Sequence, residues 1–326
     1  MNINEIAKMA GVSRATVSRY LNHGYVSEDK KASIQAVIDA TGYQPSAQAQ
    51  TMRTKRTKLI GVIIPKINSD SISRTVAGIS EVLSAADYQI LLANTANHEE
   101  AEINYLSVFQ KNRVDGILLL GTIFTKEHLH AFERLQIPIV IIGQSLPHYS
   151  CVYYDDFNAA RELTQKLLPA ASKIGYLGVT KKDIAVGTRR FEGFLQALTD
   201  AGRSFDSSCY EEVTFTIDSG TAGAGALFKR HPDIDTLFCV TDRIAIGAID
   251  YLESCGYKIP ETVQITGMGD SQIASICRPK LTTVHYYYKT SGEEAARLLL
   301  QILDFGNELC RELKMGYSII ERDSLR

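Results

Sequence analysis

The spacing of apolar side chains changes near residue 59. In residues 1–58, apolar residues recur every three to four positions over short stretches, which predicts helices. From residue 59 onward, near-continuous runs of Ile, Val and Leu alternate with longer helical patterns. Such runs are typical of parallel strands that are covered on both faces. The pattern therefore predicts a small helical head followed by a larger α/β body.

Three short helices are predicted in the head. Each begins after a residue that caps helices well, namely Asn2, Ser13 and Ser27. Glu5 stands three positions after Asn2, so the two side chains can form a capping box. The third helix is expected to end near Gly42, because glycine tolerates the left-handed conformation that commonly follows a helix. Helices this short are unstable alone, so the three must pack together.

The second predicted helix, residues 14–21, has the layout of a DNA-reading helix. It follows a turn at Gly11, and the small Ala7 lets the first two helices approach closely, as in a helix-turn-helix. On such a face arginine can grip guanine, alanine can touch a thymine methyl group, and hydroxyl, amide and imidazole groups can hold phosphates. Taken singly, each side chain has a solvated helix face as its alternative. Together they predict DNA contacts at Ser13, Arg14, Ala15, Thr16, Ser18, Arg19, Asn22 and His23.

The distribution of charge supports this interpretation. Residues 1–58 contain nine Lys or Arg against four Asp or Glu, a net charge of +5, so the remaining residues carry −7 of the chain's total of −2. A basic head on an acidic body is expected of a polyanion-binding module, and a solvated basic tail is the alternative that would give the same charge count. Residues 43–58 end in a string rich in Lys and Arg, which predicts a basic linker of marginal helicity that orders when it binds DNA.

Residues 6–22, IAKMAGVSRATVSRYLN, resemble the head of the lactose/galactose repressor (LacI/GalR) family, which reads VAxxAGVSxxTVSRxxN. The resemblance implies that residues 46–58 are the hinge helix of that family, which enters the minor groove and wedges an apolar side chain between base pairs. Met52 stands at the wedge position, where the family usually has Leu, and Ala49 and Arg53 are implied neighbouring contacts. An unbranched Met can still unstack a base step, although it is less rigid.

The body is predicted to be a doubly wound α/β structure. Strand-like runs cover residues 59–65, 88–93, 114–120, 138–143, 173–178, 236–240 and 263–267, with helical patterns between most of them. So many units favour two lobes over one sheet. The resemblance implies two lobes like those of a periplasmic binding protein. The expected domains are a helix-turn-helix head over 1–45, a hinge over 46–58 and a core over 59–326, with an N-lobe of about 59–158 plus 290–326 and a C-lobe of about 159–289.

A ligand is expected beyond the carboxyl ends of the strands, as in other open α/β sheets. Position along the chain alone selects Asn68, Asp70, Ser71, Asp155, Thr241 and Asp242. The resemblance adds Arg190 within a string similar to RxxGF, together with Phe215, Asp270, Tyr286 and Tyr288. A helix N-cap is the structural alternative for Asp155, and a core position is the alternative for Tyr288. Polar and charged groups beside aromatic faces suit a polyhydroxylated ligand.

One string departs from the pattern of the family. An effector-binding acid is expected within a Gly-aromatic-Asp-Asp/Asn string, but residues 267–270 are Gly-Met-Gly-Asp. Gly269 therefore stands where the acid is expected, and Asp270 is the residue left to take its role. This string and the polar cluster over residues 68–71 are most similar to the sucrose-operon type of repressor in Gram-positive bacteria.

These features predict a transcriptional regulator and not an enzyme. We expect a cytoplasmic homodimer that represses a carbohydrate-utilisation operon, binds palindromic double-stranded operator DNA, and has its operator affinity controlled by a small sugar or sugar phosphate. No membrane association, metal or cofactor is expected. One alternative is a global regulator controlled by a phosphorylated protein partner. The other is an α/β enzyme fused to a DNA-binding head. Against the enzyme, glycine-rich residues 220–225 lack the GxGxxG spacing, and His128 and His130 point to different helix faces.

Overall fold

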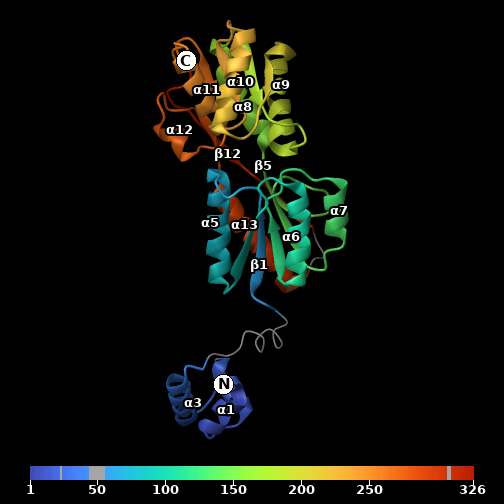
Figure 1. The fold of residues 1–326 in the computed structure, drawn as a ribbon, viewed down its shortest axis with the longest axis vertical. Helices are drawn as coiled ribbons and strands as arrows, with labels where there is room; N and C mark the ends of the chain where they lie inside the picture. Colours follow the sequence, from blue (N-terminus) through green and yellow to red (C-terminus); the bar gives the residue numbers. More distant parts are fainter. Residues whose placement is uncertain (23, 44–55, 307–309) are drawn as a thin grey trace. The chain divides into compact units, whose positions relative to one another are not determined.

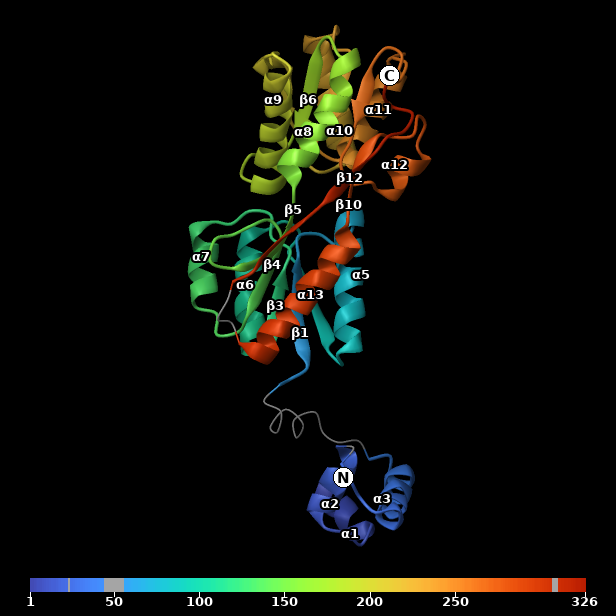
Figure 2. The same cartoon turned by 180° about the vertical axis from the view of Figure 1, so that it is seen from behind.

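The computed structural model describes residues 1–22, 24–43, 56–306 and 310–326. The chain forms two compact units, Met1–Lys58 and Leu59–Arg326. Figure 1 and Figure 2 show both units from opposite sides. Within the described residues, no helix is long and apolar enough to cross a membrane.

In its described residues, the first unit is a bundle of three short helices. It contains α1 (Ile3–Met9), α2 (Arg14–Leu21) and α3 (Glu28–Thr41). The predicted capping box is confirmed, because the Asn2 backbone N–H donates to Glu5 Oε2 at 2.8 Å and the Asn2 side chain accepts from Glu5. Ser13 caps α2 as predicted, whereas the Ser27 side chain makes no capping hydrogen bond. The core of the bundle consists of Ile6, Ala7, Val17 and Ile34.

The N-lobe of the second unit is built on a parallel sheet. Its strand order is β11-β5-β4-β3-β1-β2 in the described residues. The strands are β1 (Leu59–Ile64), β2 (Gln89–Asn94), β3 (Gly116–Leu119), β4 (Ile139–Gly143), β5 (Ser150–Tyr154) and β11 (Glu312–Met315). Alternate residues of β1 enter two different cores: Val62 packs beneath one face of the sheet and Ile63 beneath the other. The continuous apolar runs of the sequence therefore reflect burial on both faces.

Helices cover both faces of this sheet. They are α5 (Asp70–Ala85), α6 (Glu99–Lys111), α7 (Lys126–Glu133) and α13 (Tyr288–Phe305). Figure 2 shows α5 and α13 side by side, and residues of both helices share one core with β1. On the opposite face, Leu106 and Phe109 of α6 and Phe132 of α7 form the second core.

The C-lobe repeats this architecture on a smaller parallel sheet with the order β7-β6-β8-β9. Its strands are β6 (Ile174–Gly178), β7 (Tyr210–Glu212), β8 (Thr236–Cys239) and β9 (Gln264–Thr266). Its helical segments are α8 (Asp156–Leu167), η1 (Leu168–Ala170), η2 (Ile184–Arg189), α9 (Arg190–Asp200), η3 (Ser207–Cys209), α10 (Ile217–Arg230), α11 (Asp242–Ser254) and α12 (Gln272–Ile276). The predicted fold of a helical head and two doubly wound lobes is thus confirmed. The glycine-rich residues 220–225 lie inside α10 and not in a loop before a helix.

Within the part of the second unit that the structure describes, the chain passes between the lobes at three places (Figure 2). These are the junctions of β5 with α8, of β10 (Thr283–Tyr286) with α13, and of β11 with β12 (Tyr317–Ile320). Strands β10 and β12 pair antiparallel at this crossover. The prediction that residues 290–326 belong to the N-lobe is wrong at the end of the chain. The Ser324 hydroxyl donates to the carbonyl of Ile265 at 2.7 Å, so the last residues complete the C-lobe.

Candidate functional site

The surface of α2 carries the predicted DNA contacts that the structure describes. Ser13, Arg14, Ala15, Arg19 and Asn22 are exposed, and Val17 is the buried residue that anchors the helix. No ion pair or hydrogen bond ties the guanidinium groups of Arg14 and Arg19 to other described residues. Both cations are therefore free to meet an anionic partner.

Three polar residues of this surface are partly committed to the helix itself. The Ser13 hydroxyl accepts from the Thr16 backbone N–H at 3.2 Å, and the two hydroxyls lie 2.9 Å apart. The Asn22 amide donates to the carbonyl of Ser18. These hydrogen bonds hold the three side chains in place. Their oxygen atoms keep lone pairs that can accept a hydrogen bond from a water molecule bound to a DNA phosphate. The predicted contacts at His23, Ala49, Met52 and Arg53 lie outside the described residues.

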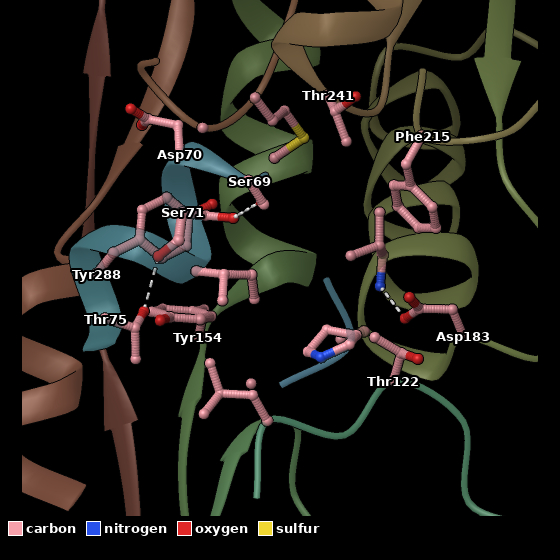
Figure 3. A pocket seen from close by; sticks show the side chains of 18 of the residues that line it. Ser69, Asp70, Ser71, Thr75, Thr122, Tyr154, Asp183, Phe215, Thr241 and Tyr288 are labelled. Carbon is pink, nitrogen blue, oxygen red and sulfur yellow. Dashed lines mark hydrogen bonds between the residues drawn. The ribbon is translucent and has the colours of Figure 1, made fainter. Parts of the chain in front are cut away.

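The second unit encloses a cavity of about 200 Å³ that is lined by residues from both lobes. Its walls include the segments that follow the carboxyl ends of β1, β2, β3, β4 and β5 in the N-lobe and of β6, β7, β8 and β9 in the C-lobe. Figure 3 shows Asp70, Ser71, Tyr154 and Tyr288 on one side of the cavity and Asp183 and Phe215 on the other. This is the edge at which open α/β sheets bind ligands.

Arg190, the first residue of α9, is held by a buried acid. Its Nε atom donates to Asp156 Oδ1 at 2.7 Å, and its guanidinium also donates to the Val240 carbonyl. Burial opposes the charge of Arg190, but the neighbouring Tyr286 and Asp156 outweigh burial and raise the pKa of Arg190. The Tyr286 hydroxyl donates to the same Asp156 oxygen at 3.0 Å. Within the described residues the Nη2 atom of Arg190 has no hydrogen bond, so it can donate to a ligand.

Asp242 fixes the segment that follows β9. Its Oδ2 atom accepts from the Ser271 backbone N–H at 2.7 Å, and its Oδ1 atom accepts from the Thr283 hydroxyl. Burial raises the pKa of Asp242, and these hydrogen bonds limit the rise. Thr241 caps α11 through the N–H of Ile244. Both residues line the cavity, but their side chains have structural partners.

Asp183 lies in the cavity wall at the start of η2. Its carboxylate accepts from the Val186 backbone N–H at 2.9 Å, and its side chain is 3% exposed. Burial raises the pKa of this carboxyl to about 6. A carboxyl in this position can accept hydrogen bonds from sugar hydroxyls.

Aromatic side chains line opposite walls of the cavity. Tyr154 and Tyr288 pack edge to face with their ring centroids 5.2 Å apart, and the Tyr154 hydroxyl lies 2.6 Å from that of Ser291. On the other wall, the Nζ atom of Lys66 lies 5.0 Å from the centroid of the Phe215 ring. The cavity therefore combines ring faces with polar groups, as pockets for polyhydroxylated ligands do.

Seven of the predicted effector residues line the cavity: Asp70, Ser71, Arg190, Phe215, Thr241, Asp242 and Tyr288. The other four do not. Asn68 is exposed, Asp155 caps α8 and meets Lys314 at 3.1 Å, and Tyr286 lies in the core behind Asp156. For Asp155, the structural alternative of a helix N-cap is the arrangement observed.

Asp270 is also directed away from the cavity. Its carboxylate accepts from His285 Nδ1 at 2.8 Å and from Arg322 at 2.5 Å. Burial would raise the pKa of Asp270, but Arg322 and His285 outweigh burial and lower it. Gly269 lines the cavity at φ +135°, a conformation that favours glycine over any acid. Asp270 therefore does not replace the acid that Gly269 lacks.

Sequence reasoning missed several residues that line the cavity: Lys66, Thr75, Asn97, Thr122, Tyr154, Asp183, Arg243 and Ser271. The rule of searching just after each strand could have found Lys66 and Thr122, since both follow predicted strands closely. Asp183 lies five residues beyond β6, and no local pattern marks it. The choice between Asp155 and Asp156 depends on how α8 begins.

Both parts of the chain match models of known families. Residues 57–322 match the model described as periplasmic binding proteins and sugar binding domain of LacI family, and residues 2–46 match that of bacterial regulatory proteins, lacI family. The chain is 32% identical over 303 residues to the sucrose operon repressor of Staphylococcus xylosus, which covers 93% of each protein.

Solved structures share the fold over the full length. The complex of the transcriptional regulator CelR with cellobiose has a TM-score of 0.77 and 26% identity, with 99% of each chain covered. The lac repressor dimer bound to operator and the anti-inducer ONPF has a TM-score of 0.91 and 19% identity, with 100% of this chain and 99% of that chain covered. The latter likeness concerns the fold alone.

Proposed function

Because this chain belongs to the LacI family of bacterial regulatory proteins, we propose that it controls a carbohydrate-utilisation operon. It is a DNA-binding transcriptional repressor with a sugar-binding domain. Its operator affinity responds to a small sugar or sugar phosphate that binds between the two lobes. The chain is a regulator and not an enzyme, like the relatives that it matches. As a homodimer it reads a palindromic operator in the cytoplasm.

The observation that carries the effector proposal is the cavity at the carboxyl ends of both sheets. It brings together an arginine with a free donor, buried carboxyl groups and aromatic rings from the two lobes. Each sugar hydroxyl needs both a donor and an acceptor, and apolar ring faces suit the C–H surface of a sugar. The relatives named above include a sucrose operon repressor and a regulator in complex with cellobiose, which favours a carbohydrate.

Effector binding can reach the DNA-binding unit through the position of the lobes. The Arg74 guanidinium of α5 in the N-lobe donates to the Asp270 carbonyl in the C-lobe at 3.1 Å. A ligand that contacts both walls favours the lobe arrangement in which both contacts form. The hinge of residues 46–58 leads directly into β1, so a change in the N-lobes of a dimer would alter the spacing of the two hinges.

On the DNA, the proposed base readers of α2 are Arg14, Ala15 and Ser18, with Arg19 beside them. Thr16 and Asn22 are proposed to position the helix through the phosphates. The hinge contacts at Ala49, Met52 and Arg53, and the phosphate contact at His23, remain sequence-based proposals.

Operator binding with and without sugars tests the proposal. The operator is first selected from random DNA with the purified full chain, and its affinity is then measured at fixed salt in the presence of single sugars and sugar phosphates. We expect one of them to change operator affinity by ~5- to 150-fold, the usual range of allosteric coupling. Unchanged operator affinity across the panel would reject a sugar effector, while failure to select any DNA would reject the α2 assignment.

A further inference from the structure

Two cations line the effector cavity without an acidic partner. Lys66 follows β1 in the N-lobe, and Arg243 is the second residue of α11 in the C-lobe. Neither side chain forms an ion pair or a hydrogen bond with any residue in the described part of the chain. The contact of the Lys66 ammonium with the face of the Phe215 ring holds it in the cavity wall.

The carboxylates of the same cavity already have partners. Asp70 faces Arg74 at 3.4 Å, Asp156 binds Arg190, Asp183 accepts from the backbone N–H of Val186, and Asp242 accepts from Ser271 and Thr283. None of these carboxylates forms an ion pair with Lys66 or Arg243 in the described part of the chain.

This arrangement is electrostatically unfavourable in the absence of an anion. Burial lowers the pKa of the Lys66 ammonium below its ordinary value, and the nearby charge of Arg243 lowers it further. A cation in the first turn of a helix also opposes the helix dipole, so the stability of α11 does not account for Arg243. An anion placed between the two side chains would relieve both effects.

The loop after β2 supplies an amide beside Lys66. Ala96 and Asn97 adopt φ values of +52° and +62°, a left-handed conformation that is uncommon for residues other than glycine. The Asn97 backbone N–H donates to the carbonyl of Pro65 at 2.8 Å, which ties this loop to the residue that precedes Lys66. Asn97 lines the cavity and can add a neutral donor to the two cations.

We propose that Lys66 and Arg243, with Asn97 beside them, bind one anionic group on a sugar effector, either a phosphate monoester or a carboxylate. This inference rests on the proposed function of the cavity as an effector site. The sugar ring lies in the remaining polar and aromatic part of the cavity. Because Lys66 and Arg243 belong to different lobes, the anion bridges the lobes and favours their approach.

Matched sugars test the proposal directly. One series consists of glucose, glucose 6-phosphate and glucuronate, which share a ring and differ only at C6. A second series consists of galactose, galactose 6-phosphate and galacturonate. Binding of each compound to the full chain is measured by calorimetry at neutral pH. We expect an anionic member of at least one series to bind ~10-fold or more tightly than its neutral parent, as charge-assisted hydrogen bonds require. A preference for the phosphate or for the carboxylate identifies which anion is bound, and either result supports the subsite.

Two variants locate the anion. Lys66→Gln and Arg243→Gln should each lower the ratio of anionic to neutral affinity ~10-fold, whereas Lys66→Arg should retain it. Lys181→Gln is the matched control, because Lys181 also lies over an aromatic ring, 4.8 Å from the centroid of Phe191, but does not line the cavity. Unchanged thermal unfolding shows that each variant is folded.

Two results would overturn the subsite while leaving the proposed function intact. One is a neutral sugar that binds as tightly as its anionic partners. The other is an equal loss of affinity for both classes in the Lys66 and Arg243 variants. If no sugar of either class binds and none changes operator affinity, the effector assignment itself is wrong and the anionic subsite falls with it.

Discussion

Asp183 illustrates how a single residue can be placed for binding at a cost to stability. Its carboxyl is buried in the wall of the cavity, and burial raises its pKa from the ordinary 3.8 to about 6. The folded protein holds this proton up to about pH 6, whereas the unfolded chain releases it near pH 3.8. Stability therefore falls as the pH rises between these two values, and the penalty is fully present above them.

We predict that Asp183→Asn stabilises the protein more at high pH than at low pH. Asparagine keeps an oxygen for the Val186 N–H and removes the buried charge. The gain in free energy of unfolding at about pH 8 should exceed the gain at about pH 5 by ~1 kcal/mol. Urea unfolding followed by tyrosine fluorescence measures it, since the chain has no tryptophan. An equal gain at the two pH values would mean that the carboxyl does not titrate as described.

Arg14 allows a second residue-scale prediction, on the DNA-binding surface. It is exposed on α2 and unpaired among the described residues. If Arg14 contacts guanine, Arg14→Ala should remove about 1–3 kcal/mol of discrimination at one base pair of each half-site. Binding to a set of operators with single base changes measures this effect. A uniform loss of affinity across all operators would instead make Arg14 a phosphate contact. Arg19→Ala can be tested in parallel on the same set of operators.

At the scale of elements, glycines set the distance between packed helices. A Cβ atom on Gly292 of α13 would lie 2.0 Å from the carbonyl oxygen of Thr75 in α5, and one on Gly78 would lie 2.0 Å from that of Lys289. Backbone thus meets backbone where α5 crosses α13. In the C-lobe, Gly247 of α11 faces α10 in the same way. The crossing in the N-lobe matters for function because α5 carries Asp70 and Ser71 to the cavity and Arg74 to its contact with Asp270 of the C-lobe.

We predict that Gly292→Ala destabilises the second unit by about 2–3 kcal/mol, because the two helices must separate to admit the methyl group. Gly316→Ala is the control, since nothing lies within 4 Å of the position of its Cβ atom. Thermal unfolding of both variants measures the difference. If the two substitutions proved equally mild, the close crossing of α5 and α13 would not limit stability.

At the scale of the whole second unit, the contact of Arg74 with Asp270 links the two lobes. Arg74 also lies over the Tyr288 ring, with 5.5 Å between its Cζ atom and the ring centroid. Arg74→Met keeps the length and apolar stem of the side chain and removes the charge. Because the contact forms only when the lobes are close together, its loss should disfavour the effector-bound arrangement.

We therefore predict that Arg74→Met weakens effector binding by ~10-fold, the value of one charge-assisted hydrogen bond. It should also reduce the change in operator affinity that the effector causes. In the unaltered protein, effector and operator must change each other's affinity by the same factor, which two independent titrations can check. A variant with weaker effector binding but an unaltered coupling factor would show that Arg74 binds the ligand without linking the lobes.

Local patterns in the sequence were sufficient for the elements and for the DNA-binding head. The capping residues Asn2 and Ser13 act within four residues of themselves, so α1 and α2 could be predicted from neighbouring positions. The central strands β1, β3, β4, β6, β8 and β9 could be predicted because burial on both faces demands continuous apolar runs. The predicted runs did not include β7, β11 and β12, which are largely exposed or only partly buried and carry no such run. Position after a strand was also enough to select Asp70, Thr241 and Asp242 for the cavity wall.

Contacts between distant residues decided the rest. Whether Asp155 or Asp156 faces the cavity depends on the start of α8 and on Arg190, which lies 34 residues from Asp156 along the chain. The ion pair with Arg322 holds the Asp270 side chain outside the cavity. The last residues of the chain belong to the C-lobe because Ser324 donates to the carbonyl of Ile265. Sequence alone thus determined the capped helices of the head and the buried central strands, since those depend on periodicity and local caps, and the motif over residues 6–22 determined the family. Only the tertiary structure decided which charges in the cavity are paired, because pairing depends on distances in space. It is in the tertiary structure that Lys66 and Arg243 line the cavity without forming an ion pair with an acid.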